Sequence, residues 1–235
     1  MVYATVSYET FQRQKYPKFG HDNPHPMNFE FWLYMVETGY SAWEAREEFG
    51  CTNKLREGPI WCFQRHGMSS TVLPDGCVVH IGGEHEEYFD PDYCIYNDVV
   101  VKHPNGEINI YGYPMNFFQP SHYHSATLVD NNIYIIGSLG YQQDRVLGET
   151  RVFLLDCDTF EMKKLNTKGE NPGWIYEHSS EYIQEKNCLR IEKGKIITFD
   201  TDSEGNSEND KNVYEENQEV FLLNLTTKQW FAVKK

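Results

Sequence analysis

A phrase of about twenty residues occurs three times in this chain, and the repetition limits what the chain can fold into. Aligned on their serines, the copies lie 56 residues apart (Ser69 to Ser125) and 54 residues apart (Ser125 to Ser179). In each copy, two runs rich in apolar residues flank a turn, and the second run ends beside glycine. This pattern predicts a hairpin of two antiparallel strands. The copies are RHGMSSTVLPDGCVVHIGGE (65–84), HYHSATLVDNNIYIIGSLG (122–140) and EHSSEYIQEKNCLRIEKGK (177–195).

Each hairpin is followed by a second pair of predicted strands. A strand pair, a loop and another strand pair, repeated at roughly fifty residues, is the layout of a β-propeller blade. The sequence therefore predicts an all-β fold for most of the chain. The later pairs are IYNDVVV with EINIYGYP, TRVFLLD with EMKKL, and NQEVFLLNL with KQWFAV.

The amino-terminal part of the chain follows a different pattern. Its first run, VYATVSYE at residues 2–9, predicts a strand. A helix is predicted further on, because apolar side chains recur there at i, i+3, i+4 and i+7. These side chains are Phe29, Trp32, Leu33 and Val36, and Gly39 can end the helix in a left-handed conformation.

A second short helix is predicted directly after the first. Ser41 stands three residues before Glu44, which is the pattern of a capping box, and Gly50 can end the helix. We expect residues 1–58 to form a strand and two short helices that pack on the blades of residues 59–235.

The charge balance argues against two classes of partner. The chain has 21 Lys and Arg against 35 Asp and Glu, which gives a formal net charge of −14. Nucleic acids and anionic membranes attract basic surfaces, so we expect neither as a partner. No apolar run approaches the roughly 20 residues that cross a bilayer, and no signal peptide is visible. The six cysteines form no C-x-x-C pair and are typical of reduced thiols, so we expect a cytoplasmic protein.

Particular residue types recur within the repeats. The first repeat has Arg65, Gly67, Ser69, Gly82, Gly83, Asn97 and Asp98; the second has His124, Ser125, Gly137, Leu155 and Asp156; the third has His178, Ser179, Gly194, Leu223, Asn224 and Trp230. This pattern resembles that of the kelch-repeat β-propellers, over about three quarters of the chain. The wording LPDG…IGGEHEEYFDPDYCIYNDV also resembles small uncharacterised kelch-like proteins of bacteria and protists.

The resemblance implies a kelch-type β-propeller, or a partial propeller with about three recognisable blades and a short amino-terminal helical segment. Propellers usually have four to eight blades. Three blades would leave unpaired strand edges, which promote aggregation unless they are covered. Either the amino-terminal strand and helices cover the opening, or two chains form a homodimer that completes a six-bladed ring.

The densest polar cluster is GGEHEEYFDPDY, in which Glu84, His85, Glu86, Asp90 and Asp92 stand close together. In a kelch blade this segment is a loop, and such loops gather on one face. One histidine among carboxylates suits a divalent metal such as zinc, manganese or iron. The cluster lacks the H-E-x-x-H spacing of a helical zinc site, so we favour a solvated acidic loop that binds a partner or nothing.

Three histidines are candidates for a ligand site or for structural hydrogen bonds. Alternation along a strand places His122 and His124 on the same face. His178 has the corresponding position in the third repeat. In the family that the repeats resemble, histidines at this position hold one blade to its neighbour, and we favour this structural role.

The run DTDSEGNSEND begins like a calcium loop, with Asp200, Asp202 and Glu204 before a glycine. The residue at its twelfth position is Lys211, whereas an EF-hand has a bidentate Glu there, and strands are predicted on either side where an EF-hand has helices. We favour an acidic hairpin loop, and calcium is the weaker alternative. No other cofactor is expected.

The leading functional hypothesis is a non-catalytic, kelch-like propeller module that binds a protein, a peptide or another ligand through inter-strand loops on one face. The chain has no G-x-S-x-G, no phosphate-binding loop and no dinucleotide-binding motif. The expected contacts lie in residues 84–92, 116–122 and 141–145, the last of which includes Tyr141 and Arg145.

The alternative hypothesis is an enzyme of the kelch-propeller type that acts on a sugar or a small polar metabolite, with or without a metal. In that case the reacting groups would converge on one channel. They would be Glu84, His85, His122, His124, Arg145 and His178.

Overall fold

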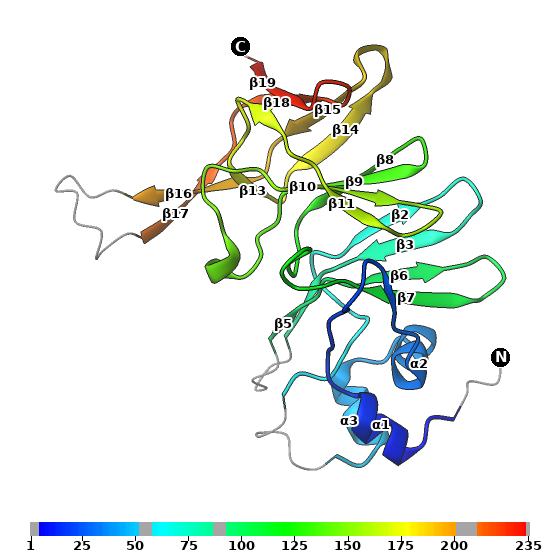
Figure 1. Cartoon of the computed structure of the whole chain (residues 1–235). Helices are drawn as coiled ribbons and strands as arrows, with labels where there is room; N and C mark the ends of the chain where they lie inside the picture. The colour runs from blue at the N-terminus through cyan, green and yellow to red at the C-terminus, as the bar shows by residue number, and fades with distance from the viewer. Residues whose placement is uncertain (1–4, 52–57, 87–92, 201–210, 234–235) are drawn as a thin grey trace. The chain divides into compact units, whose positions relative to one another are not determined.

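A computed structural model gives the fold of the chain (Figure 1). It consists of two compact units, Met1–His122 and Tyr123–Lys235. Most of the regular structure is β, in several antiparallel sheets, as the sequence predicts. The boundary predicted between residues 58 and 59 falls inside the first unit. The structure describes residues 5–51, 58–86, 93–200 and 211–233.

A helix stands where part of the amino-terminal strand was predicted. The strand prediction for residues 2–9 is wrong at its end, because Tyr8 and Glu9 belong to helix α1 (Tyr8–Gln14). The hydroxyl of Ser7 accepts a hydrogen bond from the backbone N–H of Thr10 and caps this helix. A serine at this position satisfies an N–H that would otherwise have no partner, and this local signal prevails over strand alternation.

The two predicted helices are confirmed as α2 (Glu30–Thr38) and α3 (Ala42–Glu48). Gly39 ends α2 in a left-handed conformation. Ser41 and Glu44 form the predicted capping box at the start of α3. Each residue therefore has the local role that its spacing indicates.

The first unit has one main sheet, and the three helices lie together on one side of it (Figure 1). Val100 and Ile110 are cross-strand partners in the sheet, and they share a buried core with helix residues such as Trp32. Trp32 stacks on Trp61 with ring centroids 4.7 Å apart. The strands are, in spatial order, β1 (His25–Pro26), β7 (Ile108–Gly112), β6 (Val99–Lys102), β3 (Val78–Ile81) and β2 (Ser69–Val72); a separate pair is formed by β4 (Glu84–His85) and β5 (Cys94–Ile95).

The second unit has two sheets of the same design and a smaller third one. The first is β8 (Ser125–Val129), β9 (Asn132–Ile136), β10 (Val152–Asp156) and β11 (Met162–Lys164). The second is β14 (Ser179–Ile183), β15 (Cys188–Glu192), β18 (Val220–Asn224) and β19 (Gln229–Val233), with β12 (Lys168–Gly169) parallel to β19. The third is β13 (Trp174–Tyr176), β16 (Lys195–Asp200) and β17 (Lys211–Glu216); short 3-10 helices cover Gln142–Asp144 and Gln184–Lys186.

The three repeats form three antiparallel meanders of four strands each. Ser69, Ser125 and Ser179 each begin the first strand of their own sheet, so the alignment on these serines is correct in three dimensions. The predicted hairpins are confirmed as β2–β3, β8–β9 and β14–β15. The later strand pairs complete each sheet in the predicted order.

A left-handed residue follows the second strand of every meander: Gly82 (φ 59°), Gly137 (φ 69°) and Lys193 (φ 61°). A side chain at Gly82 would overlap the carbonyl oxygen of Ser121, and one at Gly137 would overlap the carbonyl oxygen of Ile175. Both carbonyls belong to the segment that leads toward the next repeat. Glycine is therefore required here by close approach as well as by backbone conformation.

We predict that Gly137→Ala destabilises the protein by about 3 kcal/mol or more, because it adds overlap with Ile175 to the strain of a left-handed alanine. Gly148→Ala is the matched control: Gly148 has φ 84° with nothing within 4 Å of the added atom, and should cost only about 1 kcal/mol. Urea unfolding of both variants measures the difference. Equal losses would contradict the account.

Polar and apolar contacts join the two meanders of the second unit through their first strands. The Ser125 hydroxyl lies 2.8 Å from Nε2 of His178, and Thr127 donates to the hydroxyl of Ser180 at 2.8 Å. Buried apolar residues of both sheets, such as Ile136 and Leu189, share one core. The structural role favoured for His178, which holds one repeat to the next, is observed.

Burial lowers the pKa of His178 to about 4, well below its ordinary value near 6.5. Between these values the unfolded chain takes up a proton that the folded chain does not. Stability should therefore fall as the pH falls from 6.5 to 4, with a contribution from His178 of about 3 kcal/mol in total.

The measurement is urea unfolding of native protein and of His178→Gln over this range of pH. The slope of the free energy of unfolding against pH should be smaller in the variant than in the native protein, by up to about 1.4 kcal/mol per pH unit. If both proteins have the same slope, His178 is not the neutral buried group described here.

Candidate functional site

A groove of about 680 Å³ lies in the first unit, between the helices and the first repeat. One side is the end of α2 at residues 36–39. The other side is residues 63–66 with Met68, and His85, Glu86 and Lys102 complete the lining. This size is within the range of roughly 300–1,000 Å³ of ligand sites. It is the candidate functional site, and we call it the repeat-one groove.

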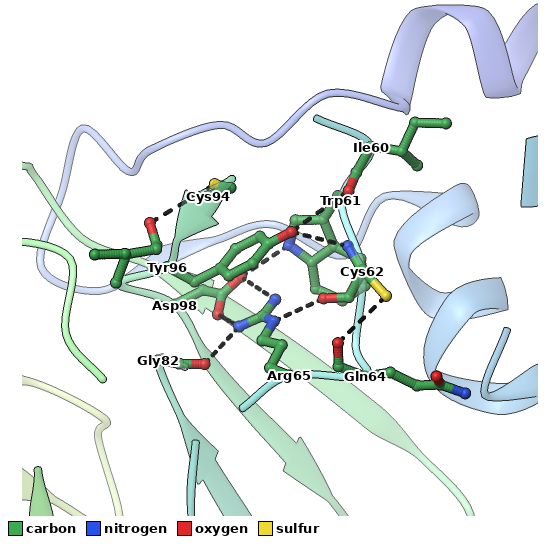
Figure 2. A network of polar contacts seen from close by, with 10 residues as sticks. Ile60, Trp61, Cys62, Gln64, Arg65, Gly82, Cys94, Tyr96 and Asp98 are labelled. Carbon is green, nitrogen blue, oxygen red and sulfur yellow. Dashed lines mark hydrogen bonds and ion pairs between the residues drawn. The ribbon is translucent and has the colours of Figure 1, made fainter. Parts of the chain in front are cut away.

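The segment leading into this groove is fixed by a buried ion pair (Figure 2). Both terminal nitrogens of the Arg65 guanidinium, Nη1 and Nη2, contact the carboxylate of Asp98, at 2.5 and 3.0 Å. Arg65 also donates to the carbonyls of Cys62 (2.6 Å) and Gly82 (2.9 Å). The Trp61 indole N–H donates to Asp98 at 2.8 Å. The pair thus links residues 61–65 to Gly82, which follows β3, and to Asp98, which precedes β6.

Aromatic rings enclose the same pair. The central carbon of the guanidinium lies 3.5 Å from the ring centroid of Tyr96 and 4.9 Å from that of Trp61. The Arg65 and Asp98 side chains are only 1% and 4% exposed. Burial acts to lower the pKa of Arg65, but the Asp98 charge and hydrogen bonds prevail and the pKa is raised. Arg65 is therefore a permanent cation held in place, and it shapes the groove wall.

A second set of contacts closes the groove toward α2. The Gln64 side-chain amide donates to the carbonyl oxygen of Gly39, the residue that ends α2. Nδ1 of His85 lies 3.1 Å from the Gln64 carbonyl oxygen. Residues 63–66 are therefore tied to the helix on one side and to β4 on the other.

The groove presents apolar surface and charges of both signs. Phe63 packs edge-on against His80 at 5.1 Å, and the Lys102 amine lies 5.7 Å from the Phe63 ring. Burial, with the charges of Lys102 and Arg65, lowers the pKa of His80 to about 4, so this imidazole is neutral at pH 7. Glu37, Glu86 and Lys102 are exposed at the rim.

The predicted acidic cluster is only partly described. Glu84 pairs with His66 through two backbone hydrogen bonds of 2.8 Å, and burial raises its pKa. His85 is buried and Glu86 is exposed. The prediction of a solvated loop is wrong at its start, because Glu84 and His85 form strand β4. Asp90 and Asp92 lie outside the described residues, so a partner-binding role for this segment stays a prediction.

The predicted histidine pair is buried: His122 is 2% exposed and His124 is 8% exposed. His122 belongs to the first unit and His124 to the second. Burial on this scale is typical of the structural role that was favoured for them.

In the second unit the candidate residues belong to separate networks. Arg145 donates to the carbonyls of Leu139 (3.0 Å) and Gly140 (3.2 Å) and to the Tyr214 hydroxyl (3.2 Å). Tyr141 directly precedes the short 3-10 helix Gln142–Asp144, and Arg145 directly follows it. Arg145 therefore fastens its own loop, whereas His178 holds two sheets together. Convergence of these groups with the histidines and Glu84 on one channel stays a prediction.

Metal binding rests on residues that are largely undescribed. Of the calcium candidates, Asp202 and Glu204 lie outside the described residues, and Asp200 is described only as the last residue of β16. Within the part of the chain that the structure describes, no three His, Cys, Asp or Glu side chains are grouped to hold a metal ion. Nor does any helix in this part have the length and apolar character to span a membrane.

Sequence reasoning missed most of the groove. It named His85, Glu86 and Arg65, but not the residues that supply the apolar surface and the rim charge, because these lie in four separate segments. One usable signal was the run FQRH before the first repeat, where an aromatic residue stands beside the motif arginine. The lining residues that were not assigned to a site are Val36, which was expected only as an apolar residue of a helix, and Glu37, Thr38, Gly39, Phe63, Gln64, His66, Met68 and Lys102.

Comparisons with known proteins do not extend these observations. No family model matches the chain, and no curated protein is similar to it in sequence.

We predict that Asp98→Ala lowers the free energy of unfolding by about 3–5 kcal/mol, because it leaves a buried guanidinium without its counter-ion. The double variant Arg65→Met with Asp98→Leu should lose much less stability than the sum of the losses in the two corresponding single variants. Denaturant unfolding followed by tryptophan fluorescence measures the cycle.

The exposed pair Lys163–Glu161 is the matched control, with a separation of 3.8 Å and side chains 57% and 47% exposed. Lys163→Met should change stability by less than about 1 kcal/mol. Additive losses at Arg65 and Asp98 would mean that the two side chains do not act as a pair.

Proposed function

We propose that the chain is a non-catalytic binding module that holds an extended peptide segment of a partner protein in the repeat-one groove. The observation that carries the proposal is the composition of this groove, in which an apolar surface from Phe63 and Met68 is flanked by charges of both signs. Apolar anchors within a polar rim are typical of sites that bind peptides.

The state of the polar groups favours binding over chemistry. Arg65 is committed to Asp98, and His85 has a hydrogen bond to the backbone of Gln64. His80 is neutral at pH 7 and bonds to Ser70 at 2.8 Å. These groups brace the wall, and the exposed side chains remain for recognition. The enzyme hypothesis has no comparable support.

The architecture that we propose for the module is a set of three kelch-type propeller blades. Three four-stranded meanders at spacings of 56 and 54 residues, and the glycines that meet the segment leading out of their own repeat, support it. A second copy of the chain completing a six-bladed ring is part of the same proposal. Short strands already cover two outer edges, β1 on β7 and β12 on β19, which limits edge-to-edge pairing.

The groove defines the chemistry of the peptide. Glu37 and Glu86 favour a basic residue in the peptide, and Lys102 favours an acidic one. Phe63 and Met68 favour an apolar side chain between these two charged residues. Complementary charges of this kind set orientation and register more than affinity.

The test is selection of peptides from a random displayed library, followed by fluorescence-polarisation titration of the best binders. Met68→Glu should weaken binding at least tenfold, because it places a charge on the apolar surface. Glu86→Lys should weaken binding of a basic peptide, and a peptide with that residue changed to Glu should restore it.

The matched control is Lys163→Glu, an exposed charge reversal in the second unit, which should leave binding unchanged. The proposal fails if selected peptides bind all the groove variants as well as the native protein.

A further inference from the structure

A second, smaller cavity in the first unit has a different chemistry. It measures about 320 Å³ and is lined by three aromatic rings, Tyr34, Tyr40 and Phe49, together with the Glu48 carboxylate, Thr38 and the amino-terminal residues Thr5 and Val6. None of these residues lies in the strand repeats. We call it the aromatic pocket.

The three rings are set at steep angles to one another. Tyr34 meets Tyr40 at 86° with centroids 5.8 Å apart, and it meets Phe49 at 69° with centroids 5.9 Å apart. Because the rings are tilted against one another, their faces and edges point in different directions around the pocket. An aromatic face carries negative charge density and attracts a cation, whereas an edge does not.

The rings are held by the local structure. Phe49 is the residue that ends α3, and its ring stacks on Phe11 at 4.4 Å and 9°. The Thr38 hydroxyl donates to the Tyr34 carbonyl at 2.8 Å and accepts from the backbone N–H of Tyr40 at 3.3 Å. The pocket is therefore preformed, and a ligand would not have to order it.

The electrostatic field in the pocket is negative. Burial, followed by Tyr40 and Glu48, raises the pKa of Tyr34 to about 12, so the phenol stays neutral while the Glu48 carboxylate supplies charge. Glu44, Glu47 and Glu48 also line an adjacent hollow beside Tyr40 and Trp43, whose ring is 50% exposed. Among the lining residues that the structure describes, neither hollow has a Lys or Arg.

From this combination we infer that the aromatic pocket binds a methylated ammonium cation. Such a cation is weakly hydrated and apolar at its surface, so it can give up water and rest against ring faces while Glu48 offsets its charge. A plain ammonium holds its water more strongly and would need hydrogen-bond acceptors. The cation can be a free small molecule of the choline type or a methylated lysine side chain of a protein.

The experiment is an NMR chemical-shift titration of the full chain with choline chloride. Its neutral isostere, 3,3-dimethylbutan-1-ol, has carbon in place of nitrogen and is the matched ligand control. Choline should give saturable shifts in residues of α2 and α3, and the neutral compound should bind at least about fivefold more weakly. Equal binding of the two, or no saturation by choline up to about 50 mM, would overturn the inference.

Variants locate the site. Glu48→Gln changes an exposed side chain and should weaken choline binding about fivefold. Tyr40→Leu should do the same, whereas Tyr34→Phe keeps the ring and should retain binding. Glu30→Gln, an exposed change in the first turn of α2, is the control. Unchanged affinity of Glu48→Gln would refute the site.

Two peptides of one sequence, with lysine or trimethyllysine, identify the source of the cation. Tighter binding of the methylated peptide than of choline would assign the pocket to a protein side chain. Equal binding of both peptides, with choline bound more tightly, would assign it to a free small cation. Either result supports recognition of the methylated ammonium group.

Discussion

The ion pair between Arg65 and Asp98 is the constraint on which the first unit depends. It is buried, bidentate and enclosed by aromatic rings, and it joins the segment that enters the first repeat to the residue that precedes β6. A buried pair of this kind is costly to desolvate and contributes little net stability, but removing one partner is severe. Its effect is to specify one path for residues 61–66. The repeat-one groove has a defined wall because of that path.

Backbone conformation supplies the second constraint, and it recurs in every repeat. Two positions are left-handed throughout: Gly67, Tyr123 and Glu177 lie two residues before the aligned serines, and Gly82, Gly137 and Lys193 follow the second strands. The left-handed backbone conformation is thus the same in all three repeats, although glycine is present at only some of these positions. At Gly82 and Gly137 a neighbouring carbonyl excludes any side chain, whereas Lys193 has a side chain at the equivalent position. In the third repeat the neighbouring carbonyl, that of Tyr176, excludes a side chain at the next residue, Gly194, instead.

Local patterns predicted the fold well and the groove poorly. The three serines, the strand pairs, the capping box of Ser41 and the glycine end of α2 could be recognised because each depends on neighbours in sequence. The strand expected at residues 2–9 was wrong at its end because one serine cap starts a helix there. The groove joins residues from α2, the entry to the first repeat, β4 and β6, and no spacing rule relates segments so far apart. No sequence pattern indicated the aromatic pocket, for the same reason. Its rings come from α2, from the connection between α2 and α3, and from the residue that ends α3.

The central claim is that the repeat-one groove is the surface on which a partner peptide binds. Hydrogen–deuterium exchange of the full chain, with and without a selected peptide, tests it most directly. The account predicts slower exchange in residues 36–39, 63–68 and 85–86, with little change in the strands of the second unit. Protection confined to the second unit, with none around Phe63 and Met68, would contradict the claim.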